Sequence, residues 1–170
     1  MHTYAHLFGI DALRLRFFTV YGPRQRPDLA IHKFTRLMSE GREIPMYGDG
    51  TSQRDYTEIE DILDGIVGAL DYITESPGTF DIVNLGGART ISLRRMIDQV
   101  AEALGTEPRI RQMKEQPGDV RRTFADVSKA ARLFSHQPRV PFEVGVRRFV
   151  DSYVSDRACE RAATPVHAQV

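Results

Sequence analysis

Cysteine and an excess of either charge are what this sequence most clearly lacks. Its 170 residues include a single cysteine, Cys159, so an internal disulfide framework is excluded and the chain is compatible with a reducing compartment. Lysine plus arginine and aspartate plus glutamate both number 23, which gives a formal net charge of zero. Because a protein that binds a bulk polyanion is expected to present a basic face, this balance argues against nucleic acid as a partner.

Long hydrophobic runs are also missing. None approaches the roughly 20 apolar residues that a membrane-spanning helix needs. The first residues are interrupted by His2, Tyr4 and His6 and have no signal-peptide pattern. The sequence therefore predicts a cytoplasmic protein with no membrane partner. His2 and His6 have the i, i+4 spacing of some metal sites, but no third ligand is placed near them, so we predict no metal.

Two patterns of nucleotide-dependent catalysis are absent as well. The nearest glycine cluster, Gly86-Gly87, lacks both the third glycine of a dinucleotide-binding turn and the acidic residue expected about 20 positions further on. The tyrosines offer no Tyr-x-x-x-Lys pair, so a tyrosine general base supported by lysine is missing. No Ser/His/Asp or Cys/His arrangement stands out, and we therefore predict no catalytic residue in this chain.

Hydrophobic periodicity shows what is present: helices and strands alternate along the chain. This alternation predicts the α/β or α+β class. We expect extended segments at about 13–17, 44–47, 55–60, 80–85 and 109–113. We expect helices at about 2–8, 28–41, 61–73, 92–104, 126–134 and 142–153. The sequence becomes rich in alanine and loses its period near residue 156, which predicts a domain over 1–155 and a loose tail over 156–170.

Helix ends and faces give more detailed expectations. Asp28, Ser92 and Asp126 each precede an apolar repeat and are predicted as N-caps. Gly9, Gly41 and Gly105 are predicted to end helices. In the helix at about 61–73, the residues expected to face the core are Ile62, Ile66, Ala69, Leu70 and Ile73.

Two segments near strand ends have side chains that suit an anionic ligand. Thr19 follows the first strand, and Arg24 and Arg26 lie just beyond it. Ligands of α/β proteins bind outside the carboxyl ends of strands, where a hydroxyl and fixed guanidinium groups suit phosphate or carboxylate. The alternative is a strand-exit loop with solvated arginines. Tyr47, before the Gly48-Asp49-Gly50 turn, is placed to stack on a base, although an aromatic here is also typical of core.

Two further segments carry arginine beside acidic groups. Arg54 follows a turn of small polar residues and is placed to bind a phosphate bidentately, while the alternative is a salt bridge to Asp55 or Glu58. The loop over 116–122, Gln-Pro-Gly-Asp-Val-Arg-Arg, presents Asp119 and two arginines, a set that suits ribose hydroxyls and phosphate. Taken alone, it is an ordinary polar loop.

Taken together, these segments resemble the extended short-chain dehydrogenase/reductase family, and within it the nucleotide-sugar epimerases and dehydratases. The resemblance covers about residues 2–153 and rests on three runs, over 16–27, 47–61 and 116–131. The run Phe-Phe-Thr-Val-Tyr-Gly-Pro-Arg-Gln-Arg-Pro-Asp looks most like UDP-glucuronate 4-epimerases. The implied fold is α/β: part of a Rossmann edge followed by a small α/β substrate-binding domain. The implied activity is NAD-dependent epimerisation of a UDP-sugar at C4.

The resemblance also implies roles at matching positions. Phe17 and Phe18 would lie against the nicotinamide side of an NAD site. Thr19 would hydrogen-bond the substrate near its sugar or diphosphate. Arg26 would approach the diphosphate or the glucuronate end.

The remaining implied roles concern the nucleotide. Pro45 and Tyr47 would bracket the uracil, Arg54 would bind the diphosphate and Asp119 the ribose hydroxyls. Many glucose/galactose epimerases have arginine where Gln116 stands, which would remove one phosphate contact. Gln116 fits the glucuronate-type subgroup, and Arg121 or Arg122, just after Asp119, would compensate.

The family's Gly-rich cofactor loop, its catalytic Ser/Thr and its Tyr and Lys have no counterpart here. We therefore expect a truncated chain that is inactive alone and whose partner, besides the UDP-sugar, is a missing N-terminal half or a homo-oligomer. The alternatives are a non-catalytic UDP-sugar-binding remnant, one half of a split enzyme, and a fragment of a UDP-sugar dehydratase or decarboxylase. In the family this half packs on the sheet of the other, so the strand over 12–19 would present an unpaired edge.

Overall fold

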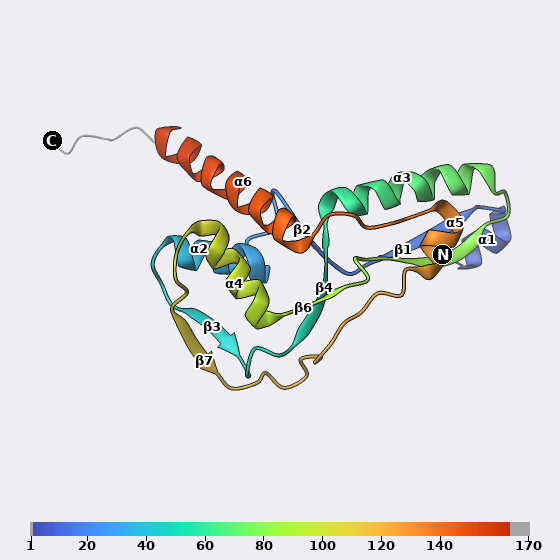
Figure 1. Ribbon diagram of the computed structural model, residues 1–170. Coiled ribbons are helices and arrows are strands. Elements are labelled where there is room, and N and C mark those ends of the chain that lie inside the picture. Colours follow the sequence, from blue (N-terminus) through green and yellow to red (C-terminus); the bar gives the residue numbers. More distant parts are fainter. Residues whose placement is uncertain (1, 164–170) are drawn as a thin grey trace.

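The structure, a computed structural model, describes residues 2–163. Helices and strands alternate through most of this range and confirm the α/β class (Figure 1). The helices are α1 (His2–Phe8), α2 (Ala30–Ser39), α3 (Ile59–Glu75), α4 (Leu93–Leu104), α5 (Ser128–Phe134) and α6 (Phe142–Ala163). The strands are β1 (Ala12–Phe17), β2 (Thr19–Tyr21), β3 (Ile44–Tyr47), β4 (Gln53–Glu58), β5 (Phe80–Leu85), β6 (Thr90–Ser92) and β7 (Ile110–Met113).

The described strands form three small sheets. Strand β1 pairs in parallel with β5, from Ala12 opposite Phe80 to Phe17 opposite Leu85. Strand β4 is central in the second sheet, parallel to β2 and antiparallel to β6. Strands β3 and β7 form the third, parallel sheet. Because parallel strands need crossover connections, the helices between them cover the sheets.

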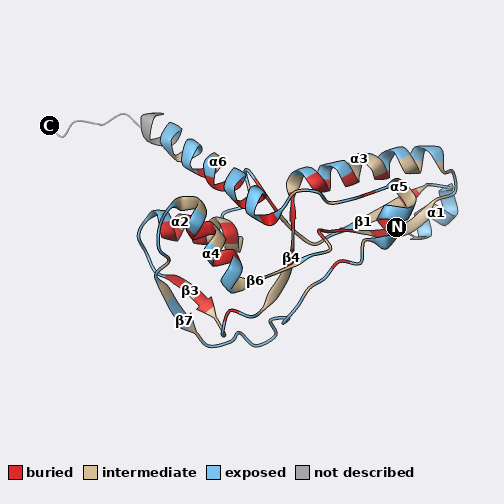
Figure 2. Ribbon diagram, viewed as in Figure 1, coloured by how far each residue is buried: buried red, intermediate tan, exposed pale blue. Residues whose placement is uncertain are grey.

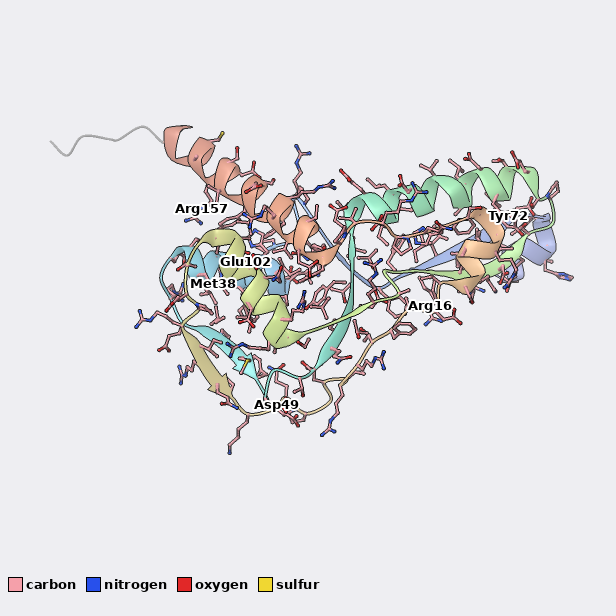
Figure 3. The ribbon with its side chains drawn as sticks, in the orientation of Figure 1. Arg16, Met38, Asp49, Tyr72, Glu102 and Arg157 are labelled. Carbon is pink, nitrogen blue, oxygen red and sulfur yellow. The ribbon has the colours of Figure 1, made fainter. Side chains whose placement is uncertain are left out.

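The molecule has two lobes, with β4 running between them (Figure 1). The larger lobe contains α2, α4, β3, β7 and the first half of α6. The sheet lobe contains β1, β5, α3 and α5. Figure 2 shows buried positions concentrated on the facing sides of α2, α4 and α6, while much of α3 is exposed. Residues Met38 of α2 and Glu102 of α4 mark the larger lobe in Figure 3.

The core of the larger lobe is built by three amphipathic helices. Their apolar residues recur at helical spacing, so each helix turns one stripe inward. Ser92 caps α4 by accepting a hydrogen bond from the Arg95 N–H at 3.2 Å, and Gly105 ends that helix in the left-handed region, both as predicted. The buried residues of this core are Tyr21, Ile31, Phe34, Leu37, Met38, Ile44, Met46, Met96, Ile97, Val100, Ala101, Phe142, Val146, Phe149, Val150 and Tyr153.

The sheet lobe has a much smaller core. Its fully buried members are Ile62, Val83, Leu85 and Ala130. The prediction for Leu70 was wrong: it is 60% exposed, and with Leu63 and Val67 it forms an apolar stripe on the outside of α3. Helix α3 packs on β1 and α5 with its other side. Within the described residues nothing covers this stripe.

The predictions for chain ends and caps need three corrections. Asp28 does not cap α2, because that helix begins at Ala30 after Leu29, and Asp28 instead accepts a hydrogen bond from Arg26. The N-cap of α5 is Val127 and not Asp126, although Asp126 accepts a hydrogen bond from the N–H of Ser128, the first residue of α5, at 2.9 Å. Helix α6 runs through 156–163, a segment expected to be loose, and residues 164–170 lie outside the described part of the chain.

No helix in the described residues is long and apolar enough to cross a bilayer.

Candidate functional site

Four of the predicted ligand residues line one cavity of about 240 Å³ in the larger lobe. They are Pro45 and Tyr47 from β3, Arg54 from β4, and Asp119 from the loop after β7. The cavity's remaining wall is completed by Asp28, Ala30, Lys33, Phe34, Ser52, Tyr56, Ile91 and Leu93. The sequence thus predicted residues that lie far apart in the chain and meet in space.

Strand pleating explains why these side chains meet. Successive side chains of a strand point to opposite faces. In β3, Ile44 and Met46 are buried in the core, so Pro45 and Tyr47 face the cavity. In β4, Asp55 is buried on one face and Arg54 lies on the other. The register places Arg54 opposite Ile91, which supplies part of the apolar wall.

A second cavity of about 270 Å³ adjoins the first and shares Tyr47, Ser52 and Asp119 with it. Gln116 and Arg121 line this second cavity and not the first. Tyr47 and Asp119 therefore line both cavities, the first more apolar and the second more polar, and together the two cavities offer a continuous candidate site.

The Gly48-Asp49-Gly50 turn follows β3, where Asp49 is labelled in Figure 3, and its Gly48 and Asp49 line the second cavity. Both glycines have positive φ, +67° and +81°, which glycine adopts without strain. The Asp49 carboxylate accepts hydrogen bonds from the Thr51 N–H at 2.9 Å and the Thr51 hydroxyl at 2.6 Å. These hydrogen bonds hold the pKa of Asp49 below its usual range, so this part of the cavity lining is anionic at neutral pH.

Arg54 and Asp119 form an ion pair across the cavity. Arg54 also donates a hydrogen bond to the Gln53 carbonyl at 2.9 Å, which fixes one side of its guanidinium group. The predicted alternative, a pair with Asp55 or Glu58, is wrong: the Asp55 carboxylate accepts from the Gly87 and Ala125 N–H groups, and the Glu58 carboxylate accepts from the Glu60 N–H. A planar guanidinium held beside a carboxylate suits a ligand that carries both anionic groups and hydroxyls.

The loop that carries Asp119 is fastened to β4 by its backbone. The Gln53 N–H donates to the Arg121 carbonyl at 2.8 Å, and the Thr123 N–H donates to the Gln53 carbonyl at 3.1 Å. This short parallel bridge aligns Asp119 with Arg54 although 65 residues separate them in sequence. Arg122 lies over the Phe124 ring, 5.3 Å from its centroid, and does not line either cavity.

Asp55, which we call the hub residue, links three segments of the chain beneath the site through its hydrogen bonds. Its carboxylate is fully buried and accepts hydrogen bonds from the Gly87 N–H at 2.8 Å and the Ala125 N–H at 2.9 Å. The Asp55 N–H in turn donates a hydrogen bond to the Thr123 hydroxyl oxygen at 3.1 Å. A single side chain therefore ties β4 to the turn after β5 and to the segment after the Asp119 loop.

Burial shapes the chemistry of Tyr56, a cavity residue that the sequence did not single out as a ligand. Loss of solvent raises the pKa of Tyr56 to about 12, partly offset by the Arg54 charge. Its ring packs against Tyr21 and Phe142, with centroids 6.1 Å and 5.4 Å away. The Tyr56 hydroxyl is therefore neutral at physiological pH, and its packed ring forms part of the cavity wall.

The other predicted residues lie outside these two cavities. Thr19 pairs with Tyr56 in the β2–β4 register, so its backbone adjoins the site while its side chain lines neither cavity. Arg26 pairs with Asp28 at 3.0 Å on the surface, and Asp28 lines the first cavity. Phe17 is 49% exposed at the carboxyl end of β1, and the Phe18 ring lies close to Gly86. Their predicted roles stay predictions.

Several residues of the first cavity were not singled out as ligands from the sequence, among them Lys33, Ser52, Tyr56 and Ile91. Ser52 lies in the polar turn before Arg54, and the alternate spacing of Ser52, Arg54 and Tyr56 could have found it. Lys33 lies in α2, whose apolar repeat was assigned to the core, although Phe34 of that repeat also lines the cavity. Nothing in the local sequence indicates that this part of α2 faces the cavity.

Comparison with known proteins places this two-lobed fold among nucleotide-sugar enzymes. A family model described as the NAD dependent epimerase/dehydratase family matches residues 1–86. A UDP-glucuronate 4-epimerase of Thermodesulfobacterium geofontis is 37% identical over 151 residues, which cover 88% of this chain and 45% of that protein. A probable UDP-glucuronate 4-epimerase of Rhizobium meliloti is 36% identical over 181 residues, 97% of this chain and 52% of that protein.

Solved structures of nucleotide-sugar enzymes have a similar fold. The UDP-glucuronic acid 4-epimerase of Bacillus cereus, in complex with UDP-glucuronic acid and NAD, superposes with a TM-score of 0.84 at 36% identity, covering 91% of this chain and 48% of that one. DesIV, a dTDP-glucose 4,6-dehydratase of Streptomyces venezuelae with NAD and TYD bound, gives a TM-score of 0.81 at 27% identity, covering 92% and 48%.

The chain therefore has the fold of the short-chain dehydrogenase/reductase type of epimerase and dehydratase. The chain belongs to the NAD-dependent epimerase/dehydratase family. It spans about half the length of the curated relatives it matches.

Proposed function

We propose that this chain is the sugar-nucleotide-binding part of an NAD-dependent epimerase that acts at C4 of UDP-glucuronate. The observation that carries the proposal is the convergence of Pro45, Tyr47, Arg54 and Asp119 on one cavity. An apolar slot beside an arginine and a carboxylate has the chemistry needed for a base, a diphosphate and a ribose. UDP-glucuronate is preferred over other sugars because the UDP-glucuronic acid 4-epimerase is 36% identical and the dTDP-glucose dehydratase 27%.

Each cavity residue has a defined task in this proposal. Tyr47 stacks on the uracil, and the Pro45 carbonyl accepts a hydrogen bond from it. Arg54 binds the diphosphate, and in doing so it exchanges part of its pairing with Asp119, whose carboxylate then accepts hydrogen bonds from the ribose hydroxyls. Gln116 completes the polar end of the second cavity, while Thr19 and Arg26 approach the sugar.

The described residues provide only an edge of an NAD site. Phe17 and Phe18 lie at the carboxyl end of β1, where a nicotinamide would be approached, but the described strand–helix turns include no Gly-rich dinucleotide turn. The residues present therefore do not hold NAD by themselves, and no hydride or proton step is assigned to this chain. Its own part in the reaction is to bind and orient the sugar nucleotide.

The sheet lobe supports a second element of the proposal, a polypeptide partner. A parallel sheet is normally covered on both faces and contains more than two strands. Here β1 pairs only with β5 in the described residues, so one edge of β1 is open. In the same lobe Phe17 is exposed at the end of β1, and Leu63, Val67 and Leu70 are exposed on the outer side of α3. We propose that a segment equivalent to the other half of the relatives adds strands at β1 and covers this surface.

Calorimetric titration of the chain with UDP-glucuronate tests the binding role. We expect binding in the wild-type chain and a loss of about tenfold or more in Arg54→Ala, because a charge-assisted hydrogen bond contributes about 1.5–3 kcal/mol. Arg42→Ala is the matched control, since Arg42 is exposed and pairs only with Glu40. A folded wild-type chain that does not bind, or a mutant that binds equally well, would contradict the proposal.

A further inference from the structure

Lys33 is a charged residue of the first cavity that has no ion-pair partner among residues 2–163. It lies in the second turn of α2, is partly buried and lines the same cavity as Arg54 and Asp119. In the described residues it makes no ion pair and no side-chain hydrogen bond, whereas the other charged groups of this cavity are paired: Arg54 with Asp119, and Asp28 with Arg26.

Charge balance shows what this lysine is available for. The two ion pairs neutralise Arg54, Asp119 and Asp28 locally. The Lys33 ammonium is not balanced by a carboxylate of the described residues, so the lining of this cavity has a net positive charge. A diphosphate brings about two negative charges to the site, and Arg54 meets them while still facing the Asp119 carboxylate. An anionic ligand therefore gains more from a cation without a carboxylate beside it, because binding then breaks no existing pair.

Position favours the diphosphate over the sugar carboxylate. Lys33 and Arg54 line the first cavity together with the proposed base-binding residues Pro45 and Tyr47. Arg26, which was predicted to approach the sugar end, lines neither cavity and lies on the surface. The nucleotide end of the ligand thus lies between α2 and β4.

We propose that Lys33 is a second cation for the diphosphate, opposite Arg54, and that it makes this site selective for nucleoside diphosphates over nucleosides. This inference rests on the proposed function. Lysine acts here as a point charge, while the planar Arg54 supplies direction.

The test is a calorimetric comparison of uridine, UMP, UDP and UDP-glucuronate on the wild-type chain, Lys33→Met and Lys33→Arg. Methionine keeps the apolar stem and removes the charge. We expect Lys33→Met to weaken UDP and UDP-glucuronate equally, by about tenfold or more, to weaken UMP less and to leave uridine unchanged. Lys33→Arg should retain most of the UDP affinity. Lys129→Met, the same change in the sheet lobe, should affect no ligand.

Each other result is decisive. If Lys33→Met binds UDP as the wild type does, the inference is wrong and the proposed function stands. If it loses uridine as strongly as UDP, Lys33 shapes the base slot and the diphosphate assignment is wrong. If only UDP-glucuronate is weakened, the lysine binds the sugar carboxylate instead. A folded wild-type chain that binds none of the four ligands overturns the proposed function and this inference together.

Discussion

The two lobes differ in how much of their own apolar surface they bury. Among the described residues the larger lobe has sixteen buried core members, drawn from all three of its long helices, while the sheet lobe has four. The larger lobe also contains both cavities of the candidate site. The difference indicates that the lobe with the candidate site buries most of its own apolar surface, whereas the sheet lobe leaves a larger share of its apolar surface exposed.

The open strand edge of the sheet lobe sharpens this contrast. In β4, between the lobes, the buried Asp55 carboxylate accepts hydrogen bonds from the Gly87 and Ala125 N–H groups. In the sheet lobe, the backbone groups along one side of β1 have no strand to pair with in the described residues. Unpaired strand edges and adjacent apolar side chains promote association with another chain. The four predictions that follow test this contrast, from the largest expected effect to the smallest.

The largest expected difference between the lobes is the stability lost when an apolar side chain is truncated. Phe149 is 2% exposed, and Phe149→Ala should reduce the free energy of unfolding by about 3–5 kcal/mol because it leaves a cavity among α2, α4 and α6. Leu70→Ala, on the open stripe of α3, should change it by less than about 0.5 kcal/mol. Urea denaturation of both variants measures the difference. Equal losses would contradict the assignment of the stable core to the larger lobe.

Removing the hub charge should weaken both the fold and the site. In Asp55→Asn, one amide oxygen still accepts, but the NH₂ group faces a backbone N–H, so the loss should be at least about 2 kcal/mol. Affinity for UDP-glucuronate should fall too, because the Asp119 loop is fastened through this segment. Asp98→Asn is the control: Asp98 pairs with Arg94 on the surface, and its loss should cost at most about 1 kcal/mol. A stable Asp55→Asn chain would show that the hub is not needed.

Adding charge to the open stripe should change association and not stability. We expect the wild-type chain to self-associate as its concentration rises, and Val67→Glu with Leu70→Glu to shift it toward monomer, as sedimentation equilibrium would show. Val154→Glu is the matched control, since Val154 is 52% exposed on α6, outside the sheet lobe. Equal effects of both changes, or a wild-type chain that stays monomeric, would count against the sheet lobe as the docking surface.

The smallest expected effect is a pH dependence at Glu58, where β4 meets α3. Burial raises the pKa of Glu58 despite the hydrogen bond it accepts from the Glu60 N–H. A raised pKa in the folded state means that the protonated form is favoured by folding, so this contribution to stability is present at low pH and is lost as pH rises through the folded-state pKa. Glu58→Gln should therefore gain stability relative to the wild type between about pH 4 and pH 7. A constant difference across this range would contradict the sign.

Much of the fold could be predicted from periodicity. The helix at α4 has a serine at its start, a glycine at its end and an unbroken apolar stripe, and each of these local signals agrees with the structure. The prediction that Leu70 faces the core was wrong because a helical repeat identifies apolar residues but not the element that covers them. The prediction that Asp28 caps α2 was wrong because the helix begins two residues later, at Ala30, and the Asp28 carboxylate pairs with Arg26. Helix α6 continues past residue 156, since alanine and arginine favour helix even where the apolar stripe ends.

Some residues of the candidate site were predicted from a resemblance to a known family and not from periodicity. Arg54 and Tyr47 stand in short runs whose order resembles a known family, so the sequence identified them before any contact was known. Their assembly with Asp119 depends on a backbone bridge between β4 and the loop, which leaves no mark in the sequence. Lys33 enters the cavity through the packing of α2 beside β3, a tertiary feature that local pattern does not report.

The central claim is that the larger lobe binds the sugar nucleotide by itself. Hydrogen exchange of the chain, measured with and without saturating UDP-glucuronate, tests it most directly. The account predicts slower exchange in β3, in β4 and in the loop over 116–123, with no change along β1, β5 and the outer side of α3. Protection that appears first in β1 and β5, or no protection anywhere in a folded chain, would contradict it.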